Sequence, residues 1–265
     1  MALTLTGRTD KKPCPRVDIL FDSLAAGTAT ATVYQISDEG KVPVRNAEGV
    51  YAAGGLFVTD YEVPLGVPVT YTAEQFDASG VSLGYTTQAT VQVDSLPGAA
   101  WVQDPLDPSS AVEVGAADGF ADEVKETREV KLVRVGNDTV ALMAAMGLIE
   151  NVSLRTWTDS PEDAAAYRAV LRRTQVLVRT MPNMPIPRCL HIVAAVIPRR
   201  GFDIAQGGTL YVWDLVGDEV TRSALNIIVP VVTWQRYIDA FPTWGDFDAA
   251  YGTWLDALEN PPAEV

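Results

Sequence analysis

The stretch VTYTAEQFD, from Val69 to Asp77, shows the residue pattern that decides the fold of the N-terminal part of this chain. In it, Val69, Tyr71 and Ala73 alternate with polar residues. Successive side chains of a β-strand point to opposite faces of the sheet. The alternation therefore predicts a strand with one buried face and one solvated face.

Four further stretches among residues 1–95 have strand length and are rich in Val, Thr, Tyr and Phe. They are VDILF (17–21), TATATVYQI (28–36), GLFVTDYEV (55–63) and YTTQATVQV (85–93). Clusters of Asp, Ser, Asn and Gly separate the strands at the spacing expected for hairpins and Greek-key links. We therefore expect a mainly β protein that begins with a β-sandwich over residues 1–95.

The segment PLGVPVTYTAEQFDASG, from Pro64 to Gly80, resembles part of a fibronectin type III domain. A turn, then Tyr71, then a strand ending in Asp-x-x-Gly is similar to the penultimate strand region of that family. The resemblance implies a two-sheet sandwich of the immunoglobulin-like class. Such modules are spacers and binding platforms in many proteins, so the fold alone does not assign a function.

A change in composition marks the end of the sandwich. SLPGAAWVQDPLDPSS (95–110) contains Pro97, Pro105 and Pro108 together with several Asp and Ser residues. This composition is typical of a stiff, solvated chain. We therefore expect a Pro-rich linker over residues 96–110.

The second domain, expected over residues 111–232, is rich in strands. NVSLRTWT (151–158), QVLVRT (175–180) and RCLHIVAAVI (188–197) predict strands, and the last is apolar on both faces, as a central strand should be. Residues 138–149 fit either a short helix or a buried strand, because periodicity does not separate the two. We expect a β-barrel or sandwich with one α-helix packed outside it.

The tetrapeptide SPED (160–163) predicts where that helix begins. Ser160 is a favourable N-cap and Pro161 fits the first helical position. The two acidic residues that follow lie where the helix dipole stabilises negative charge. The sequence predicts a surface helix over residues 160–173.

Near the C-terminus a ten-residue unit starts three times, as TWQRYIDAFP (233–242), TWGDFDAAYG (243–252) and TWLDAL (253–258). Each unit begins with a Thr suited to capping a helix, and a Pro or Gly interrupts the helices. We expect a docking tail of short helices over residues 233–265. Its candidate interaction residues are Trp234, Tyr237, Trp244, Phe247, Tyr251 and Trp254. The alternative is that these aromatic residues form core within their own chain.

The order of these parts is similar to that of minor tail proteins of long-tailed, siphovirus-type phages that infect actinobacteria. SPEDAAAYRAVLRRTQVLVRTMP (160–182) and the closing array TWGDFDAAYGTW (243–254) carry the resemblance. It implies a distal-tail-like component of the virion tail tip, assembled in the cytoplasm of the bacterial host. It also implies a homo-oligomeric ring of three or six subunits, and contacts to other phage tail proteins.

The charge balance limits the partners. The chain carries 34 acidic and 20 basic residues, a formal net charge of −14. This argues against specific nucleic-acid binding, which needs a basic face, although DNA could slide past an acidic channel wall. No apolar run approaches the roughly 20 residues that span a bilayer, and the start of the sequence lacks the order of a signal peptide. We therefore expect folding in a cytosol.

The sequence offers little for catalysis. His191 is the single histidine, and Cys189 and Cys14 are the only two cysteines. A structural zinc site needs four ligands, and these three residues do not complete one. A buried core histidine and two unpaired thiols are the simpler expectation. The chain contains no nucleophile elbow and no phosphate-binding loop followed by lysine. We expect no enzymatic activity, no metal and no cofactor.

These patterns predict a structural protein that acts by assembly, and the resemblance implies that it is part of a phage tail. The alternative is a host cell-surface or carbohydrate-binding module of the tail, with Tyr34, Tyr51 and Phe57 of the sandwich as an aromatic platform. A cell-wall hydrolase is less favoured, because it would need two carboxyl groups that converge in a cleft.

Overall fold

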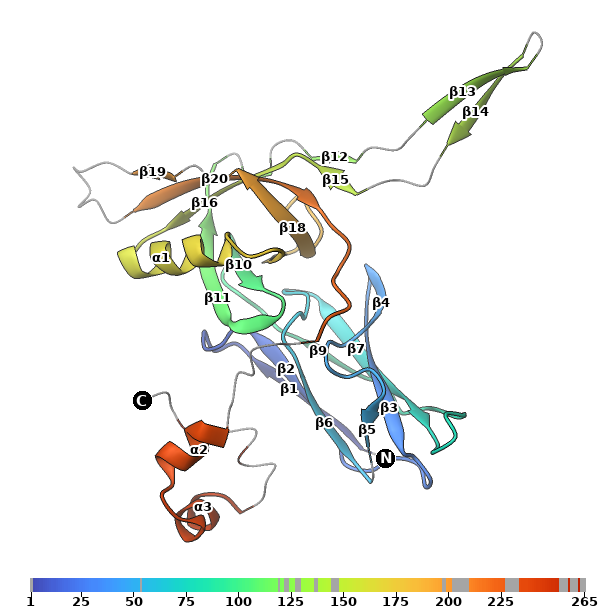
Figure 1. Cartoon of the computed structure of the whole chain (residues 1–265), viewed down its shortest axis with the longest axis vertical. Coiled ribbons are helices and arrows are strands. Elements are labelled where there is room, and N and C mark those ends of the chain that lie inside the picture. The colour runs from blue at the N-terminus through green and yellow to red at the C-terminus, as the bar shows by residue number, and fades with distance from the viewer. Residues whose placement is uncertain are drawn as a thin grey trace.

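Strands are the main secondary structure of the computed structural model (Figure 1). The structure describes residues 2–262 apart from positions 53, 119, 122–123, 127–129, 136–137, 144–147, 197–198, 202–209, 227–233, 253–256 and 258–261. The chain forms an N-terminal sandwich, a barrel, a projecting hairpin and two short helices near the C-terminus. The expected mainly β fold is confirmed.

Two antiparallel sheets form the N-terminal sandwich. The first has the order β1 (Leu3–Arg8), β2 (Arg16–Phe21), β6 (Leu56–Asp60). The second has the order β4 (Gly40–Pro43), β3 (Thr30–Ser37), β7 (Pro68–Phe76), β8 (Ser82–Tyr85), with β5 (Val50–Tyr51) paired to β3 and β9 (Ala89–Gln92) paired to β7. Val69, Tyr71 and Ala73 are buried in the sandwich core, as their alternation predicts, but Thr72 of the face expected to be solvated is buried as well. The expected β-sandwich is confirmed.

A closed barrel of six strands follows the sandwich. Its strands are β10 (Ala99–Asp104), β11 (Asp107–Ala116), β16 (Val152–Thr158), β17 (Val176–Thr180), β18 (Cys189–Val196) and β20 (Tyr211–Glu219). They run in the order β16-β11-β10-β17-β18-β20, and the ring closes because β20 also pairs with β16. The short strand β19 (Arg199–Gly201) pairs with β20. Since β18 lies between β17 and β20, its expected central position is confirmed.

Helix α1 (Pro161–Val170) packs against β10, β11 and β16. The Ser160 hydroxyl accepts a hydrogen bond from the Asp163 backbone N–H at 3.0 Å, so the predicted N-cap is confirmed. Tyr167 is buried, and its ring meets the Trp213 indole edge-on with centroids 5.3 Å apart. The helix is shorter than the predicted 160–173, because Leu171 is its C-cap.

Strands occupy most of residues 96–110, which corrects the expectation of a solvated linker. Trp101 of β10 is only 2% exposed and belongs to the same core cluster as the sandwich residues. Pro97 precedes β10, Pro105 lies in the turn between β10 and β11, and Pro108 lies at the hairpin end of β11, next to a register shift. Prolines are tolerated at such turns, strand ends and irregularities. Composition therefore predicted a solvated linker where the chain forms a β-hairpin.

Buried polar groups join the sandwich to the barrel. Arg179 of β17 is fully buried, and its Nη1 donates to the carbonyl oxygens of Pro15 at 2.8 Å and Val63 at 3.3 Å. Glu62 of the sandwich accepts from Arg45 Nε and from Arg222 Nε, each at 2.6 Å, and Arg222 follows the barrel strand β20. These bonds hold the two parts as one body.

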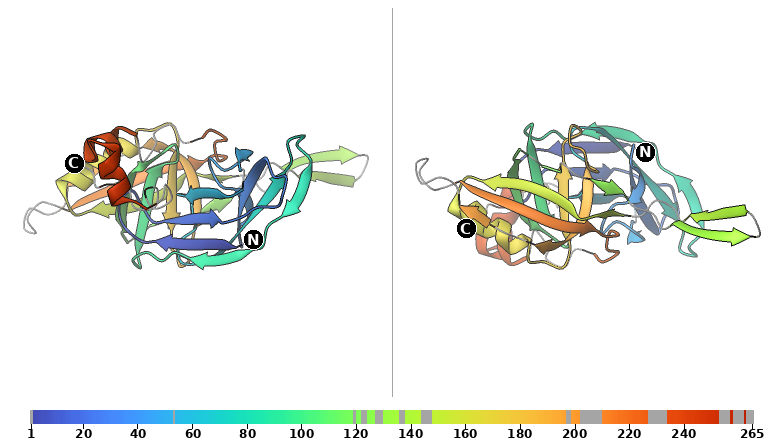
Figure 2. Two further views of the ribbon diagram at one scale, coloured as in Figure 1. Left: turned by 90° about the horizontal axis from the view of Figure 1, so that it is seen from below. Right: turned by 90° about the horizontal axis from the view of Figure 1, so that it is seen from above.

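A two-stranded hairpin projects from the barrel. Its strands β13 (Val130–Val135) and β14 (Asp138–Met143) pair with each other, and β12 (Lys125–Glu126) and β15 (Ile149–Glu150) pair at its base. Figures 1 and 2 show β13 and β14 extending beyond the body; we call these two strands the arm. Residues 138–143 are therefore strand, which settles the helix-or-strand alternative for that part of 138–149.

Two short helices, α2 (Trp234–Ala240) and α3 (Trp244–Ala250), lie in the docking tail expected at 233–265. The expected short C-terminal helices are thus confirmed for the first two repeat units; most of the third lies outside the described residues. None of the helices described is long and apolar enough to cross a membrane.

Candidate interaction surfaces

The two C-terminal helices build a small aromatic core of their own. Tyr237 is 8% exposed and Phe247 is 6% exposed, and they pack with Phe241, Tyr251 and Ala257. The rings of Tyr237 and Phe247 meet edge-on with centroids 5.9 Å apart. Figure 1 shows α2 and α3 beside the body rather than within it, and we call this part the C-terminal unit.

A capping box begins α3. The Thr243 hydroxyl accepts from the Asp246 backbone N–H at 3.2 Å, and the Asp246 carboxylate accepts from the Thr243 backbone N–H at 3.1 Å. This reciprocal pair satisfies donors that the first turn of a helix leaves unbonded. Trp244, the first residue of α3, is 66% exposed, and its ring contacts Phe247 at 5.8 Å between centroids.

The six predicted interaction residues therefore divide between core and surface. Tyr237 and Phe247 are buried inside the C-terminal unit, Tyr251 is half-buried beside them, and Trp244 is exposed. Trp234 begins α2, but its side chain lies outside the described residues, as does all of Trp254. Tyr237 and Phe247 therefore form core within their own chain, which was the alternative expectation. Trp244 is exposed, as a docking residue would be.

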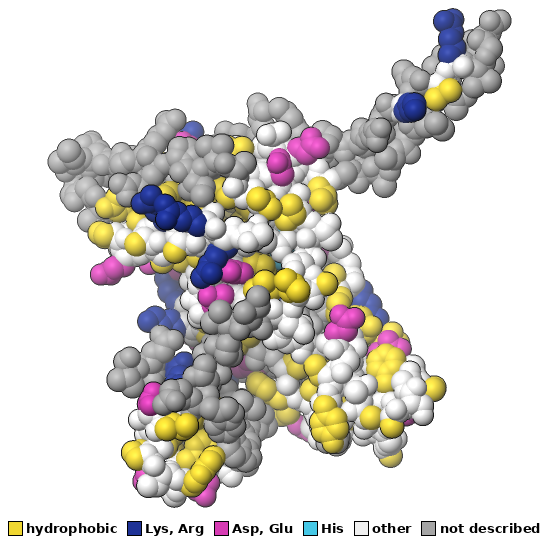
Figure 3. Space-filling view, viewed as in Figure 1, with side chains coloured by type: hydrophobic (Ala, Val, Ile, Leu, Met, Phe, Trp, Pro, Cys, Tyr) yellow, Lys and Arg dark blue, Asp and Glu magenta, His cyan; other side chains and the backbone are white. Residues whose placement is uncertain are grey.

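The arm is a second surface, and it is not among the interaction surfaces predicted from the sequence. Eight of the twelve residues in VKLVRV and DTVALM are apolar. A hairpin of only two strands is marginally stable in water, since it lacks a covered hydrophobic face. Lys131 and Arg134 of β13 are exposed, and Figure 3 shows basic side chains along the arm. The apolar content of two adjacent short strands was the signal available in the sequence.

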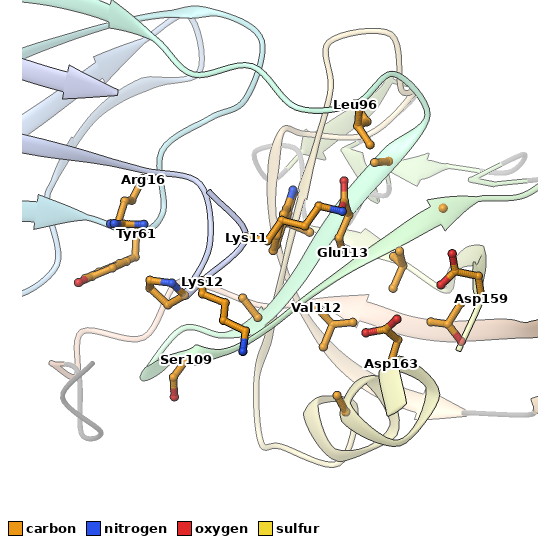
Figure 4. Close-up of a pocket in the computed structure, with 18 of the residues that line it drawn as sticks. Lys11, Lys12, Arg16, Tyr61, Leu96, Ser109, Val112, Glu113, Asp159 and Asp163 are labelled. Carbon is orange, nitrogen blue, oxygen red and sulfur yellow. The ribbon is translucent and has the colours of Figure 1, made fainter. Parts of the chain in front are cut away.

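A cavity of about 990 Å³ lies where the sandwich meets the barrel, and we call it the notch. Its walls are β11, the start of α1 and the loop between β1 and β2 (Figure 4). In Figure 4, Asp159 and Asp163 lie at the α1 side, and Lys12 and Arg16 lie toward the sandwich. Asp18 of β2 also lines the notch and forms an ion pair with Arg8.

One ion pair and one close packing contact shape the notch. Lys11 forms an ion pair with Glu113 of β11. This contact and nearby Asp159 raise the pKa of the Lys11 ammonium despite some burial. The Trp157 ring covers Gly115, where an added Cβ would lie 2.0 Å from Trp157 Cε2. A side chain at position 115 would therefore displace the indole from the notch.

The strand β11 presents an open edge in the notch. It pairs with β10 over most of its length but with β16 only at Gly115 and Ala116. Beyond Thr158 the chain leaves β16 and turns into α1, so within the described chain no strand continues along β11. The Ala116 N–H bonds Gly98 O, and alternation along the strand then directs the backbone groups of Ala111 and Glu113 away from β10.

The outer face of the sandwich carries a cluster of tyrosines. Lys41 Nζ lies 3.9 Å from the ring centroid of Tyr34 and 4.5 Å from that of Tyr85. The Tyr85 hydroxyl donates to Glu74 at 2.9 Å. Tyr51, in β5, is 79% exposed. Of the expected platform residues, Tyr51 is exposed, whereas Tyr34 and Phe57 are half-buried.

His191 and Cys14 lie inside the protein, and Cys189 is half-buried. His191 is 7% exposed, and burial lowers its pKa to about 4, with Glu62 opposing and Arg222 and Arg45 adding to that shift. Cys14 and Cys189 are unpaired thiols, and burial raises the pKa of each. Cys189 Sγ donates to the carbonyl oxygen of Glu62 at 3.2 Å. The expected core histidine and unpaired thiols are confirmed.

Within the described ranges, no group of three or more His, Cys, Asp or Glu residues is placed to hold a metal ion. Comparisons of the chain with protein-family models, with curated proteins and with solved structures found no match. Function is therefore argued from the arm, the notch and the C-terminal unit themselves.

Proposed function

We propose that this chain is a structural subunit of a phage tail tip, which assembles with copies of itself and with other tail proteins. The arm is the observation that carries the proposal. Two mainly apolar strands extend from the body, and such a hairpin gains stability when a partner covers it. A subunit built for assembly provides that partner.

The C-terminal unit supports the same function. It has a capped helix and an aromatic core, and it presents Trp244 at 66% exposure. Large aromatic side chains are enriched among the residues that dominate binding energy at protein interfaces. The unit is thus suited to dock on a neighbouring subunit.

The fixed join between sandwich and barrel also suits a structural role. Arg179 and the Arg45–Glu62–Arg222 cluster cross from one part to the other inside the protein. A subunit whose two parts keep one orientation can repeat regularly in a ring of three or six copies. In such a ring an acidic wall would repel passing DNA rather than bind it, consistent with the net charge of −14.

Immunogold labelling of purified particles that carry this protein tests the proposed location in the virion. Antibodies raised against residues 1–95, the sandwich, should place gold at the end of the tail. Gold on the capsid, or protein found only in the cell lysate, would contradict a tail-tip role.

A host-surface or carbohydrate-binding module is the second candidate, favoured by the tyrosines on the outer sandwich face. Tyrosine rings at such exposure provide flat apolar area with a polar tip. Co-sedimentation of the full chain with insoluble host cell-wall polysaccharide tests it, with the Tyr51→Ala, Tyr85→Ala double variant as control. Sedimentation of the original chain that is lost in the double variant would favour the second candidate.

A further inference from the structure

We infer that the notch receives the arm of a second copy of this chain, with one arm strand pairing to the open edge of β11. The inference rests on the proposed function, because it names a contact through which subunits assemble. It assigns an acceptor surface, a donor element and the charges that align them.

The acceptor is a strand edge with room beside it. Ala111 and Glu113 direct backbone N–H and C=O groups away from β10, on the side that β16 covers only at Gly115 and Ala116. A peptide strand added at such an edge gains main-chain hydrogen bonds along its length. The notch, at about 990 Å³, provides the space for it.

The donor is a strand pair with edges of its own. Each arm strand pairs only with the other within the described chain, so each has one outer edge available. Unpaired edges and apolar composition are the features that make a strand join a sheet of another chain. The arm therefore offers a strand that can pair with the open edge of β11.

Charge aligns the two elements. Lys131 and Arg134 are exposed on the arm, whereas Asp159 and Asp163 line the α1 wall of the notch. Asp163 already accepts from the Ser160 hydroxyl, and both carboxylates act on the nearby Lys11, whose own ion pair is with Glu113. An arm strand laid along β11 brings a basic side chain to Asp159.

Position on the molecule fixes the mode of assembly. The arm projects from one side of the body and α1 lies on the other, in Figure 1 and in both views of Figure 2. The start of α1 lines the notch. A contact from one side of a subunit to the opposite side of the next is head-to-tail, and it closes into a ring when the rotation permits. The same contact would then repeat around the ring.

The first test is zero-length cross-linking of the full chain, using a mixture of natural-abundance and nitrogen-15-labelled protein. A carbodiimide should join the Lys131 ammonium to the Asp159 or Asp163 carboxylate, and mass spectrometry should find the link between labelled and unlabelled chains. An oligomer without this interchain link would overturn the notch contact while leaving assembly itself intact. A chain that stays monomeric at every concentration would overturn both.

The second test is charge exchange at the same contact. Asp159→Lys should weaken self-association about tenfold, since reversing one partner turns an attraction into a repulsion. The double variant Asp159→Lys, Lys131→Asp should recover most of that loss. Glu48→Lys, at an exposed site in the sandwich, is the control for net charge. Equal weakening by Asp159→Lys and Glu48→Lys, without recovery in the double variant, would overturn the proposal.

Discussion

The Nε of Arg222, just after the last barrel strand, lies 2.6 Å from Oε2 of Glu62 in the sandwich. Glu62 binds Arg45 through its other oxygen, so one buried carboxylate holds two guanidinium groups from different parts of the fold. Burial opposes ionisation of Glu62, but the charges of Arg222 and Arg45 hold its pKa below the usual range. The carboxylate is therefore charged at neutral pH.

Replacing Glu62 by Gln should destabilise the protein by about 3 kcal/mol, because it leaves the buried Arg45 without its counter-charge. Urea unfolding followed by circular dichroism measures the change. Glu48→Gln is the matched control at an exposed site, and it should stay within about 0.5 kcal/mol of the original chain. Equal stability of the two variants would show that the cluster does not hold the domains together.

Lowering the pH should destabilise the folded protein through His191. Its pKa falls from an unfolded value of about 6.5 to about 4, because burial disfavours the imidazolium. Below about pH 6.5 the unfolded chain binds the proton more readily than the folded one. The free energy of unfolding is therefore highest above about pH 6.5 and falls as the pH drops toward about 4, by at most about 3 kcal/mol.

Chemical denaturation at several pH values between 7 and 5 measures this decline. The variant His191→Gln removes the titrating group, so its curve should be flatter than that of the original chain over this interval. Asp60 and Glu62 titrate in both proteins, and the difference between the two curves isolates His191. Parallel curves would mean that His191 titrates as an exposed imidazole does.

Gly66 marks a close approach between sandwich and barrel. It has φ of 72°, and a Cβ there would lie 2.7 Å from both Met181 Cε and Pro182 Cδ. Gly66→Ala should therefore cost about 2 kcal/mol or more, from left-handed backbone strain and from the clash. Thermal unfolding gives the loss.

Gly80 provides the control for that variant. It has a similar φ of 78°, but an added Cβ would meet nothing within 4 Å. Gly80→Ala should carry the backbone strain of about 1 kcal/mol alone. If both variants lose the same stability, the contact of Gly66 with the barrel contributes nothing.

Much of the fold could be predicted because its signals are local. The alternation around Tyr71 and the SPED cap at Ser160 each lie within a few residues. The first sandwich strand (3–8) and the division of the last strand at residues 86–88 were missed. Short edge strands carry weaker patterns than buried ones, and their pairing depends on neighbours far along the chain.

The contacts between domains could not be predicted in the same way. Arg179 bonds Pro15, and Arg222 bonds Glu62, across large sequence separations that leave no local pattern. The notch likewise combines β11, α1 and the loop between β1 and β2. At the C-terminus the repeat located the aromatic residues, but only packing distinguishes buried Phe247 from exposed Trp244.

Changing Trp244 and Trp254 together to Ala should abolish incorporation into a larger assembly while leaving the sandwich folded. Trp244 is exposed and lies outside the sandwich and barrel cores, so its loss should spare the body. Size-exclusion chromatography measures assembly, and circular dichroism checks the strands. Undiminished incorporation would count against docking through these indoles.

Solution mass, measured by light scattering, tests the central claim of assembly most directly. The full chain and a chain lacking residues 233–265 are compared over a range of concentrations. We predict a closed oligomer for the full chain and weaker association for the shortened one, because the shortened chain keeps the arm contact but loses the docking of the C-terminal unit. A full chain that remains monomeric throughout would contradict self-assembly.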